Sequence, residues 1–248
     1  MNDMFKIKAK NVAPSPWPNS FDFDTDPVCQ EYFKPFIEEH LNTLREYDET
    51  RDLKSDYVFH KHVQDAAQDV RETCMNLGLG SRIANNMYHA TLIHDLGKPE
   101  LPAEIWDYED SPPDEIKALK REHVDIGHAV FARQFADINH PFKDLALDII
   151  RNHHERMDGL GQHKMGADEI SDPVRLVCIV EDYDGRTHLR AHHKEMGLTN
   201  DAPAVFERME EKCDGWFDPE IYEAFKTIKL EQHYAAQNLE HEDRPQFD

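Results

Sequence analysis

His94 and Asp95 are adjacent residues that lie between an apolar run and a glycine. A histidine beside an aspartate offers a metal one neutral nitrogen and one carboxylate, and the carboxylate can bridge a second ion. Further residues of the same ligand types follow along the chain: His123, His153, His154, Glu181, Asp182 and Asp184. If separate helices supply these ligands, the sequence predicts a multinuclear metal centre inside a helical bundle.

The elements that must position these residues are helices. Apolar residues recur at every third or fourth position through most of the chain, and no alternating pattern of useful length indicates a strand. Asp26 before Pro27 has the form of a helix start, a cap followed by a first-turn proline. The predicted helices cover residues 26–47, 57–77, 81–94, 113–123, 125–137, 142–152 and 174–184, with two more beginning at Pro203 and at Asp218. The fold class predicted is all-α, with residues 155–172 as a loop.

Composition limits the partners of this chain. Its 248 residues include 28 basic and 50 acidic side chains, which gives a formal net charge of −22. Such a surface repels nucleic acid and anionic membranes, so neither is an expected partner. A small phosphorylated nucleotide remains a compatible substrate, because bound divalent ions reverse the local field.

Two further features concern location. No run approaches the roughly 18 apolar residues of a membrane span, and residues 1–10 lack the apolar core of a signal peptide. The four cysteines are far apart and form no C-x-x-C pair, which favours reduced, buried thiols: Cys29, Cys74, Cys178 and Cys213. We therefore expect a cytoplasmic protein.

The order of these motifs resembles the HD superfamily of metal-dependent phosphohydrolases, and more narrowly its HD-GYP branch. The resemblance covers about residues 57–190 and implies an HD-domain helical bundle. It rests on three stretches, His94-Asp95-Leu96-Gly97-Lys98, then Leu101 to Ile105 leading to Lys120 through Gly127, and His153-His154-Glu155-Arg156-Met157-Asp158-Gly159-Leu160-Gly161.

The resemblance implies roles for residues of this chain. One metal would be held by His62, His94, Asp95 and an acidic residue near 181, and the second by Asp95, His123, His153 and His154. A hydroxide between the two ions would attack phosphorus, and Lys98 would stabilise the transition state as a point charge. The expected cofactors are two divalent ions, with iron or manganese as the first choice and magnesium, nickel or zinc as alternatives.

The chain departs from the family pattern at three places. The Gly-Tyr-Pro motif is replaced by Gly161-Gln162-His163. A gapless alignment makes Glu181 the acidic ligand, whereas a shift of one residue makes it Asp182, and we prefer Glu181. Some members bind a third metal through a glutamate four residues before the first histidine, where this chain has Val58, so two metals are expected.

Several histidines need a choice between a ligand and a structural role. His62 is preferred over His60 as the first ligand, because it leads into the apolar face of its helix. His188, His192 and His193 lie in a polar stretch and are expected on the surface. Lys98 has the alternative of being a plain solvent-facing lysine.

The sequence thus predicts an extended N-terminal arm (1–25), an N-terminal helix (26–56), an HD-GYP-like catalytic domain (57–190) and C-terminal helices that complete the bundle (191–248). The leading hypothesis is a phosphodiesterase for a cyclic dinucleotide, with cyclic di-GMP first among substrates. The alternatives are a nucleotide phosphomonoesterase, a non-catalytic nucleotide sensor and a di-iron oxygenase. The helices outside the catalytic block are compatible with a homodimer.

Overall fold

The computed structural model describes residues 16–53, 57–108, 111–188 and 198–242. The described chain is helical and contains no strand, which confirms the predicted all-α class. Its α-helices are α1 (Lys34–Thr50), α2 (Phe59–Asn76), α3 (Ser81–Thr91), α4 (Asp114–Arg121), α5 (His123–Gln134), α6 (Pro141–Asn152), α7 (Asp172–Thr187), α9 (Ala202–Lys212) and α10 (Pro219–Glu242). A π-helical turn, Cys29–Phe33, precedes α1, and two 3₁₀ turns, Lys98–Glu100 and Ala103–Ile105, precede α4.

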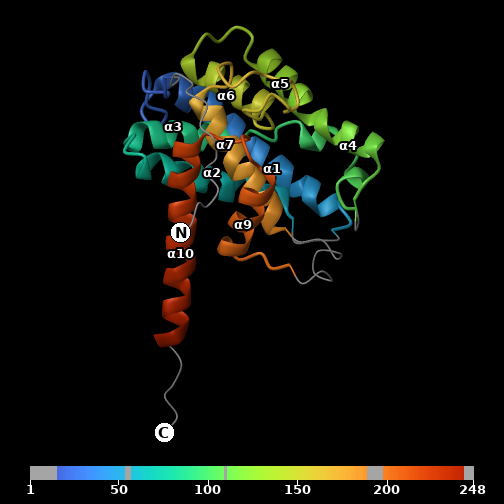
Figure 1. Ribbon diagram of the computed structural model, residues 1–248. Coiled ribbons are helices and arrows are strands. Elements are labelled where there is room, and N and C mark those ends of the chain that lie inside the picture. Colours follow the sequence, from blue (N-terminus) through green and yellow to red (C-terminus); the bar gives the residue numbers. More distant parts are fainter. Residues whose placement is uncertain (1–15, 54–56, 109–110, 189–197, 243–248) are drawn as a thin grey trace.

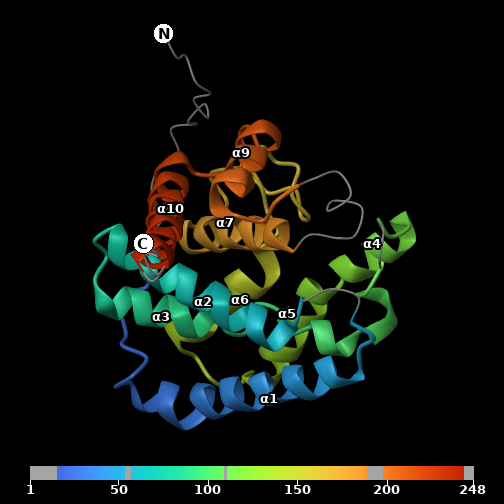
Figure 2. The ribbon, with the colours of Figure 1, turned by 90° about the horizontal axis from the view of Figure 1, so that it is seen from below.

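Helix α2 is the centre of the bundle. It packs against α1, α3, α7 and α10, and α6 packs against α3, α5 and α7. Figure 2 shows α1 along one side of the molecule and α9 on the opposite side, with α2 between them. Figure 1 shows that the C-terminal end of α10 extends away from the other helices. One continuous apolar core runs from Phe21 to Phe225, so burial of one helix face fixes the arrangement of the helices that pack on it, whereas α4 has no buried residue.

The N-terminal part of the described chain packs onto this core without regular structure. The buried Asn86 side chain accepts a hydrogen bond from the backbone N–H of Phe23 and donates to the carbonyls of Pro18 and Phe21. The Asp26 carboxylate accepts hydrogen bonds from the N–H groups of residues 28 and 29, as its predicted cap role requires. Residues 1–15 of the predicted arm lie outside the described chain.

The predicted helices are present, with differences at their ends. The helix expected over 81–94 ends at Thr91, and residues 92–97 form turns, so His94 and Asp95 lie in a turn and not on a helix. The segment after Lys98, expected as a plain loop, contains both 3₁₀ turns. The helix expected to end near residue 47 continues to Thr50. The domain boundaries at 57 and 190 remain predictions.

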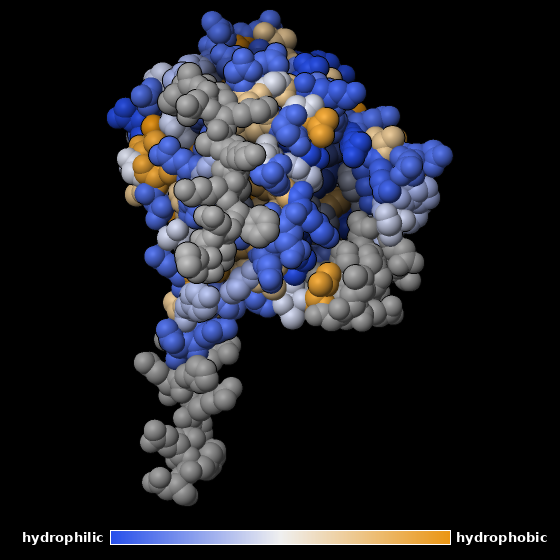
Figure 3. Space-filling view, viewed as in Figure 1, coloured by the Kyte–Doolittle hydropathy of each residue, from blue (hydrophilic) through white to orange (hydrophobic). Residues whose placement is uncertain are grey.

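The surface agrees with the high charge of the chain. On the face in Figure 3, hydrophilic residues cover most of the coloured surface, and hydrophobic residues are scattered among them. None of the helices in the described part of the chain combines the length and the apolar character needed to span a bilayer.

Candidate metal centre and its pocket

Four buried side chains from three parts of the fold form a first cluster: His62 on α2, His94 and Asp95 in the turn after α3, and Glu181 on α7. Each offers a ligand atom, and these atoms lie within 4.8 Å of one another. Glu181 Oε1 lies 2.8 Å from Nε2 of both His62 and His94. This is the donor set that the family resemblance implied for one metal.

A second cluster joins the start of α5 to the end of α6. His123, His153 and His154 each place a ring nitrogen within the same 4.8 Å limit. Asp95 lies between the clusters, because its Oδ2 is 3.3 Å from Nε2 of His62 and of His94, whereas its Oδ1 is 3.3 Å from His123 Nε2. Its two oxygens therefore face different clusters, as a bridging carboxylate requires.

The outer nitrogen of each of four imidazoles has a partner of its own. Nδ1 of His94, His123 and His153 donates to the carbonyls of Thr91, Lys120 and Ile149, at 2.7, 2.6 and 3.1 Å. Nδ1 of His62 lies 2.7 Å from Asp184 Oδ2. Since a carbonyl can only accept, these contacts hold the proton at Nδ1 and direct Nε2 inward, which is the usual orientation of metal-binding histidines.

The inward nitrogens and the carboxylates fit a cation better than they fit one another. The Nε2 atoms of His62 and His94 are 3.3 Å apart, and those of His123 and His153 are 3.2 Å apart. When the proton of each ring is on Nδ1, the lone pairs of the two Nε2 atoms in each pair face each other and repel. Asp95 Oδ1 and Glu181 Oε1 are buried and make no hydrogen bond within the described chain, whereas Asp95 Oδ2 has Lys98 as an ion-pair partner. Buried groups of this kind need compensation, so these residues are suited to hold metal ions.

The pKa values of residues in the first cluster also indicate a site for positive charge. Burial opposes ionisation of Asp95, yet Lys98 and the surrounding imidazoles hold its pKa well below the usual range. Burial likewise opposes ionisation of Glu181, but His62 and His94 lower its pKa. Burial opposes protonation of His94, yet Asp95 and Glu181 raise its pKa to about 9. A proton is thus favoured where a cation would lie, so the first cluster attracts positive charge.

Lys98 is buried beside the clusters and is not a solvent-facing lysine. Its side chain is only 6% exposed, its ammonium group pairs with the Asp95 carboxylate, and it donates to the Tyr57 hydroxyl at 3.1 Å. The rings of Phe59 and Trp106 also surround the ammonium group, with centres 4.6 and 5.8 Å away. A cation is therefore fixed next to the bridging carboxylate.

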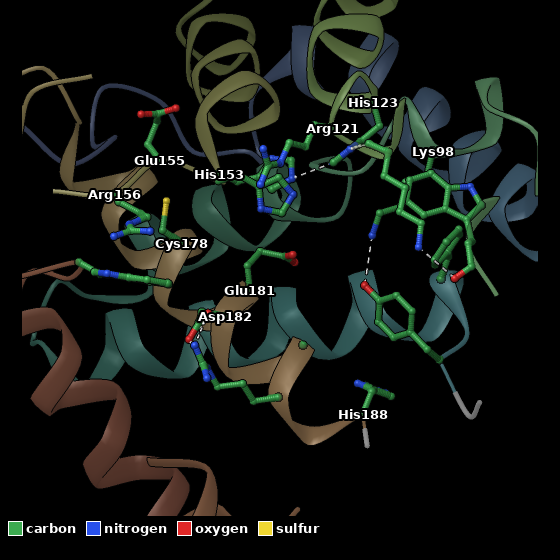
Figure 4. Close-up of a pocket in the computed structure, with 18 of the residues that line it drawn as sticks. Lys98, Arg121, His123, His153, Glu155, Arg156, Cys178, Glu181, Asp182 and His188 are labelled. Carbon is green, nitrogen blue, oxygen red and sulfur yellow. Dashed lines mark hydrogen bonds and ion pairs between the residues drawn. The ribbon is translucent and has the colours of Figure 1, made fainter. Parts of the chain in front are cut away.

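A pocket of about 580 Å³ opens onto both clusters (Figure 4). This volume is within the range of small-molecule sites. The 3₁₀ segment and α4 supply one wall, with Trp106, Tyr108 and Arg121, and the segment before α10 supplies another, with Trp216 and Phe217. The Arg156 guanidinium stacks 3.5 Å above the Trp216 ring, which ties this C-terminal segment to the loop after His153 and His154.

Glu181 and Asp182, the two candidates for the acidic metal ligand, lie in different environments. Asp182 belongs to neither cluster, and its carboxylate forms a paired hydrogen bond with Arg186 at 2.6 and 3.1 Å. Figure 4 shows Glu181 directed toward the histidines and Asp182 on the other side of α7. Geometry therefore favours Glu181 as the ligand. His60 lies outside the clusters too, since its Nδ1 contacts Asp48.

His188 was expected on the surface, and its side chain is 27% exposed. This residue lines the pocket, where its ring packs against Tyr57 with centres 4.7 Å apart and its Nδ1 donates to the Asp184 carbonyl. It lies at the end of α7, and the local polar composition did not reveal that this end reaches the pocket. His192 and His193 lie outside the described residues.

Sequence reasoning assigned no role to two residues that act on the clusters: it named Asp184 only as a member of the acidic cluster, and it did not name Tyr57. Asp184 orients His62, and the available signal was its position one helical turn after Glu181. Tyr57 contacts Lys98, and no motif indicated it. The substituted motif has its own contacts, because Gln162 Nε2 donates to the Arg121 carbonyl at 2.7 Å.

A third group with ligand atoms close together is Asp26, Cys29 and His140. Here His140 Nδ1 accepts a hydrogen bond from the Phe142 N–H at 3.1 Å, so Nε2 carries the proton and lies 3.3 Å from Asp26. The Asp26 carboxylate also accepts two backbone N–H groups. This group is satisfied without a metal and has a structural role.

Comparison with known proteins identifies the family. The HD domain model matches residues 36–221. A cyclic di-GMP phosphodiesterase of Thermotoga maritima is 26% identical over 216 residues, which are 85% of this chain and 54% of that protein. A cyclic di-GMP phosphodiesterase of Pseudomonas aeruginosa is 33% identical over 137 residues, 55% of this chain and 31% of that protein. A 3'3'-cGAMP-specific phosphodiesterase of Vibrio cholerae is 26% identical over 189 residues, 74% of this chain and 40% of that protein.

The solved structure of Bd1817, a HDG"Y"P protein from Bdellovibrio bacteriovorus, matches with a TM-score of 0.56 and 15% identity, and covers 84% of this chain and 64% of that one. At this identity the match shows the fold alone. The chain spans about half or less of the length of the curated relatives named above. The match of the family model over three quarters of the sequence shows that the chain belongs to the HD-domain family.

Proposed function

We propose that this chain is a metal-dependent phosphodiesterase that hydrolyses a cyclic dinucleotide, with cyclic di-GMP as the first substrate to test. The observation that carries the proposal is Asp95, a buried carboxylate whose two oxygens face two separate clusters of metal-ligand type. Relatives of this chain are named phosphodiesterases for cyclic di-GMP or 3'3'-cGAMP, which supports the substrate class.

The ligands in this proposal are divided between two ions. His62, His94, Asp95 and Glu181 would hold one, and Asp95, His123, His153 and His154 would hold the other. The mixture of imidazole and carboxylate favours iron or manganese. When bound, two divalent cations supply charge stabilisation for a phosphoryl group and make water more acidic.

The remaining chemistry belongs to residues of the chain. The reaction adds water across one phosphodiester bond and gives a phosphomonoester and a free sugar hydroxyl. Lys98 provides a fixed positive charge beside Asp95, where negative charge grows on the phosphoryl oxygens. The aromatic rings around its ammonium group limit the access of water, and this strengthens the electrostatic interactions at the site.

The test combines metal analysis with turnover. Purified protein is analysed for bound metal and assayed on cyclic di-GMP, 3'3'-cGAMP, an aryl phosphodiester and mononucleotides. Asp95→Ala should lose most of the metal and all phosphodiesterase activity, because it removes the shared carboxylate. Asp114→Ala is a matched control, since this carboxylate is 94% exposed on α4, and it should retain both.

Each alternative gives a distinct result. Cleavage of mononucleotides but not of cyclic dinucleotides would overturn the substrate assignment. Binding without turnover would indicate a sensor, and oxygen consumption without ester cleavage would indicate an oxygenase. Full metal content and activity in Asp95→Ala would refute the metal centre itself.

A further inference from the structure

The pocket carries several basic side chains in a chain whose net charge is −22. Three of them are neutralised locally, because Lys98 pairs with Asp95, Arg156 with Asp158, and Arg186 with Asp182. Two more basic residues line the pocket at the end of α4: Lys120, whose ammonium group donates to the Trp106 carbonyl at 3.3 Å, and Arg121.

Arg121 differs from the three neutralised residues. Within the part of the chain that the structure describes, its guanidinium has neither an ion pair nor a hydrogen bond. Two pocket carboxylates are engaged elsewhere: Asp107 forms a paired interaction with Arg51 at 2.8 and 2.9 Å, and Glu155 accepts backbone N–H groups from the loop that follows it. The guanidinium is therefore available for an anion that enters the pocket.

The backbone that carries Arg121 is fixed relative to the metal centre. The Lys120 carbonyl accepts the Nδ1 proton of His123 at 2.6 Å, and the Arg121 carbonyl accepts Gln162 Nε2 at 2.7 Å. The end of α4 is thus tied both to a metal ligand and to the loop that replaces the Gly-Tyr-Pro motif. Figure 4 shows Arg121 beside His123 on this wall of the pocket. An anion held there would have a defined position relative to the clusters.

Aromatic rings lie next to these cations. The Lys120 ammonium group is 5.6 Å from the centre of the Trp106 ring and 5.8 Å from that of Tyr108. Tyr108 is 37% exposed, and both rings line the pocket. A cation for phosphate beside an aromatic face for a base is the combination that nucleotide recognition uses.

We propose that Trp106, Tyr108, Lys120 and Arg121 form a second anion subsite, which we call the α4 subsite. It binds the phosphate of a cyclic dinucleotide that is not being cleaved, and the adjoining base stacks on Tyr108. This inference rests on the proposed function and names its substrate class, a molecule with two phosphates. The reacting phosphate lies at the metal centre, where Lys98 already supplies a cation, so a mononucleotide bound there would leave the α4 subsite unmatched.

Arg121→Gln tests the subsite. Its matched control is Arg133→Gln, which removes the same charge from an exposed position on α5 outside the pocket. KM and kcat are measured on cyclic di-GMP and on bis(p-nitrophenyl) phosphate, a single phosphodiester without a base. We expect Arg121→Gln to raise KM for cyclic di-GMP about tenfold, equivalent to about 1.4 kcal/mol, because a charge-assisted contact is lost. Its KM and kcat for the aryl ester should match those of the wild type, and Arg133→Gln should match the wild type on both.

The two possible failures are distinguishable. An equal loss on both substrates would assign Arg121 to the reacting phosphate, and no change on either would leave it without a substrate contact; both results overturn the α4 subsite. Cleavage of the aryl ester but not of cyclic di-GMP by the wild type overturns the proposed function alone. Calorimetric titration with cyclic di-GMP then tests the subsite: about tenfold weaker binding by Arg121→Gln supports it, and equal binding overturns it.

Discussion

Gly97 lies directly against the backbone of Gly127, and this contact brings the turn that carries Asp95 onto the first turns of α5. A Cβ atom on Gly97 would meet the His123 carbonyl oxygen at 2.0 Å and the Gly127 nitrogen at 2.7 Å. The φ angle of Gly97 is −85°, which any residue adopts. Glycine is therefore needed here for space and not for its conformational freedom, and the requirement comes from the site.

Gly97→Ala should consequently separate Asp95 from His123. The obstructing atoms belong to the backbone and cannot rotate away, so we expect a loss of about 3 kcal/mol in the free energy of unfolding. The amount of metal bound by this variant should also be lower than in the wild type. Urea unfolding of the metal-free protein and metal analysis check the two effects.

The control is Gly185→Ala. This glycine lies within α7, and an added Cβ would meet nothing within 4 Å. Its replacement should raise the stability by about 1 kcal/mol through helix propensity. Equal behaviour of the two variants would contradict the steric account of Gly97.

The sequence was sufficient to predict the helices that bury one face in the core. The helices were predictable because apolar residues recur at helical spacing wherever a helix packs on the core. The ends were less predictable: the third helix ends at Thr91, although the apolar pattern continues through Leu92 and Ile93. Those residues are buried in turns instead, and residue type alone does not distinguish the two situations.

The site residues that belong to sequence motifs were predictable. Those that reach the site only through tertiary packing were not. Helical periodicity left both Glu181 and Asp182 open, and only the position of α7 against α2 separates them. Trp216 lines the pocket because the segment before α10 packs on the loop after α6. That contact joins residues far apart in the chain, so no local pattern could have indicated it.

Glu181→Gln and Asp182→Asn form a pair that tests the acidic ligand. Glu181→Gln should release metal and lower turnover, since a neutral amide is a poorer ligand than a carboxylate. Asp182→Asn should retain metal and cost about 1 kcal/mol or less in stability, because its pair with Arg186 is partly exposed. Metal analysis of both variants decides the matter, and loss of metal in Asp182→Asn alone would make Asp182 the ligand.

Tyr57→Phe tests the positioning of Lys98. The phenol oxygen accepts a hydrogen bond from the ammonium group at 3.1 Å, and its removal leaves Asp95 to hold that group. We expect turnover to fall about fivefold, the equivalent of about 1 kcal/mol for one hydrogen bond, with metal content unchanged. Tyr222→Phe is a matched control: its hydroxyl is buried outside the pocket and has no hydrogen bond among the described residues. A loss of metal in Tyr57→Phe would indicate a structural role instead.

His40 makes the stability of the molecule depend on pH, and Asp95 and His94 act on its charge in opposite directions. This residue of α1 is buried, and its Nε2 has no hydrogen bond within the described chain. Burial lowers its pKa to about 4, against 6.5 in an unfolded chain. The unfolded state therefore binds the proton more readily, so the stability contributed by neutral His40 is present above pH 6.5 and is lost as the pH falls toward 4. At pH 4.5 this loss amounts to about 2.5 kcal/mol.

His40→Leu should remove this part of the acid sensitivity. The free energy of unfolding is measured at pH 7.5 and 4.5 in EDTA, so that release of metal at low pH does not contribute. The wild type should lose about 2.5 kcal/mol more than the variant between these values. Groups that do not interact with His40 affect both proteins equally and cancel in the difference, whereas Asp95 and His94 interact with it. The same loss in both proteins would show that unfolding does not add a proton to His40.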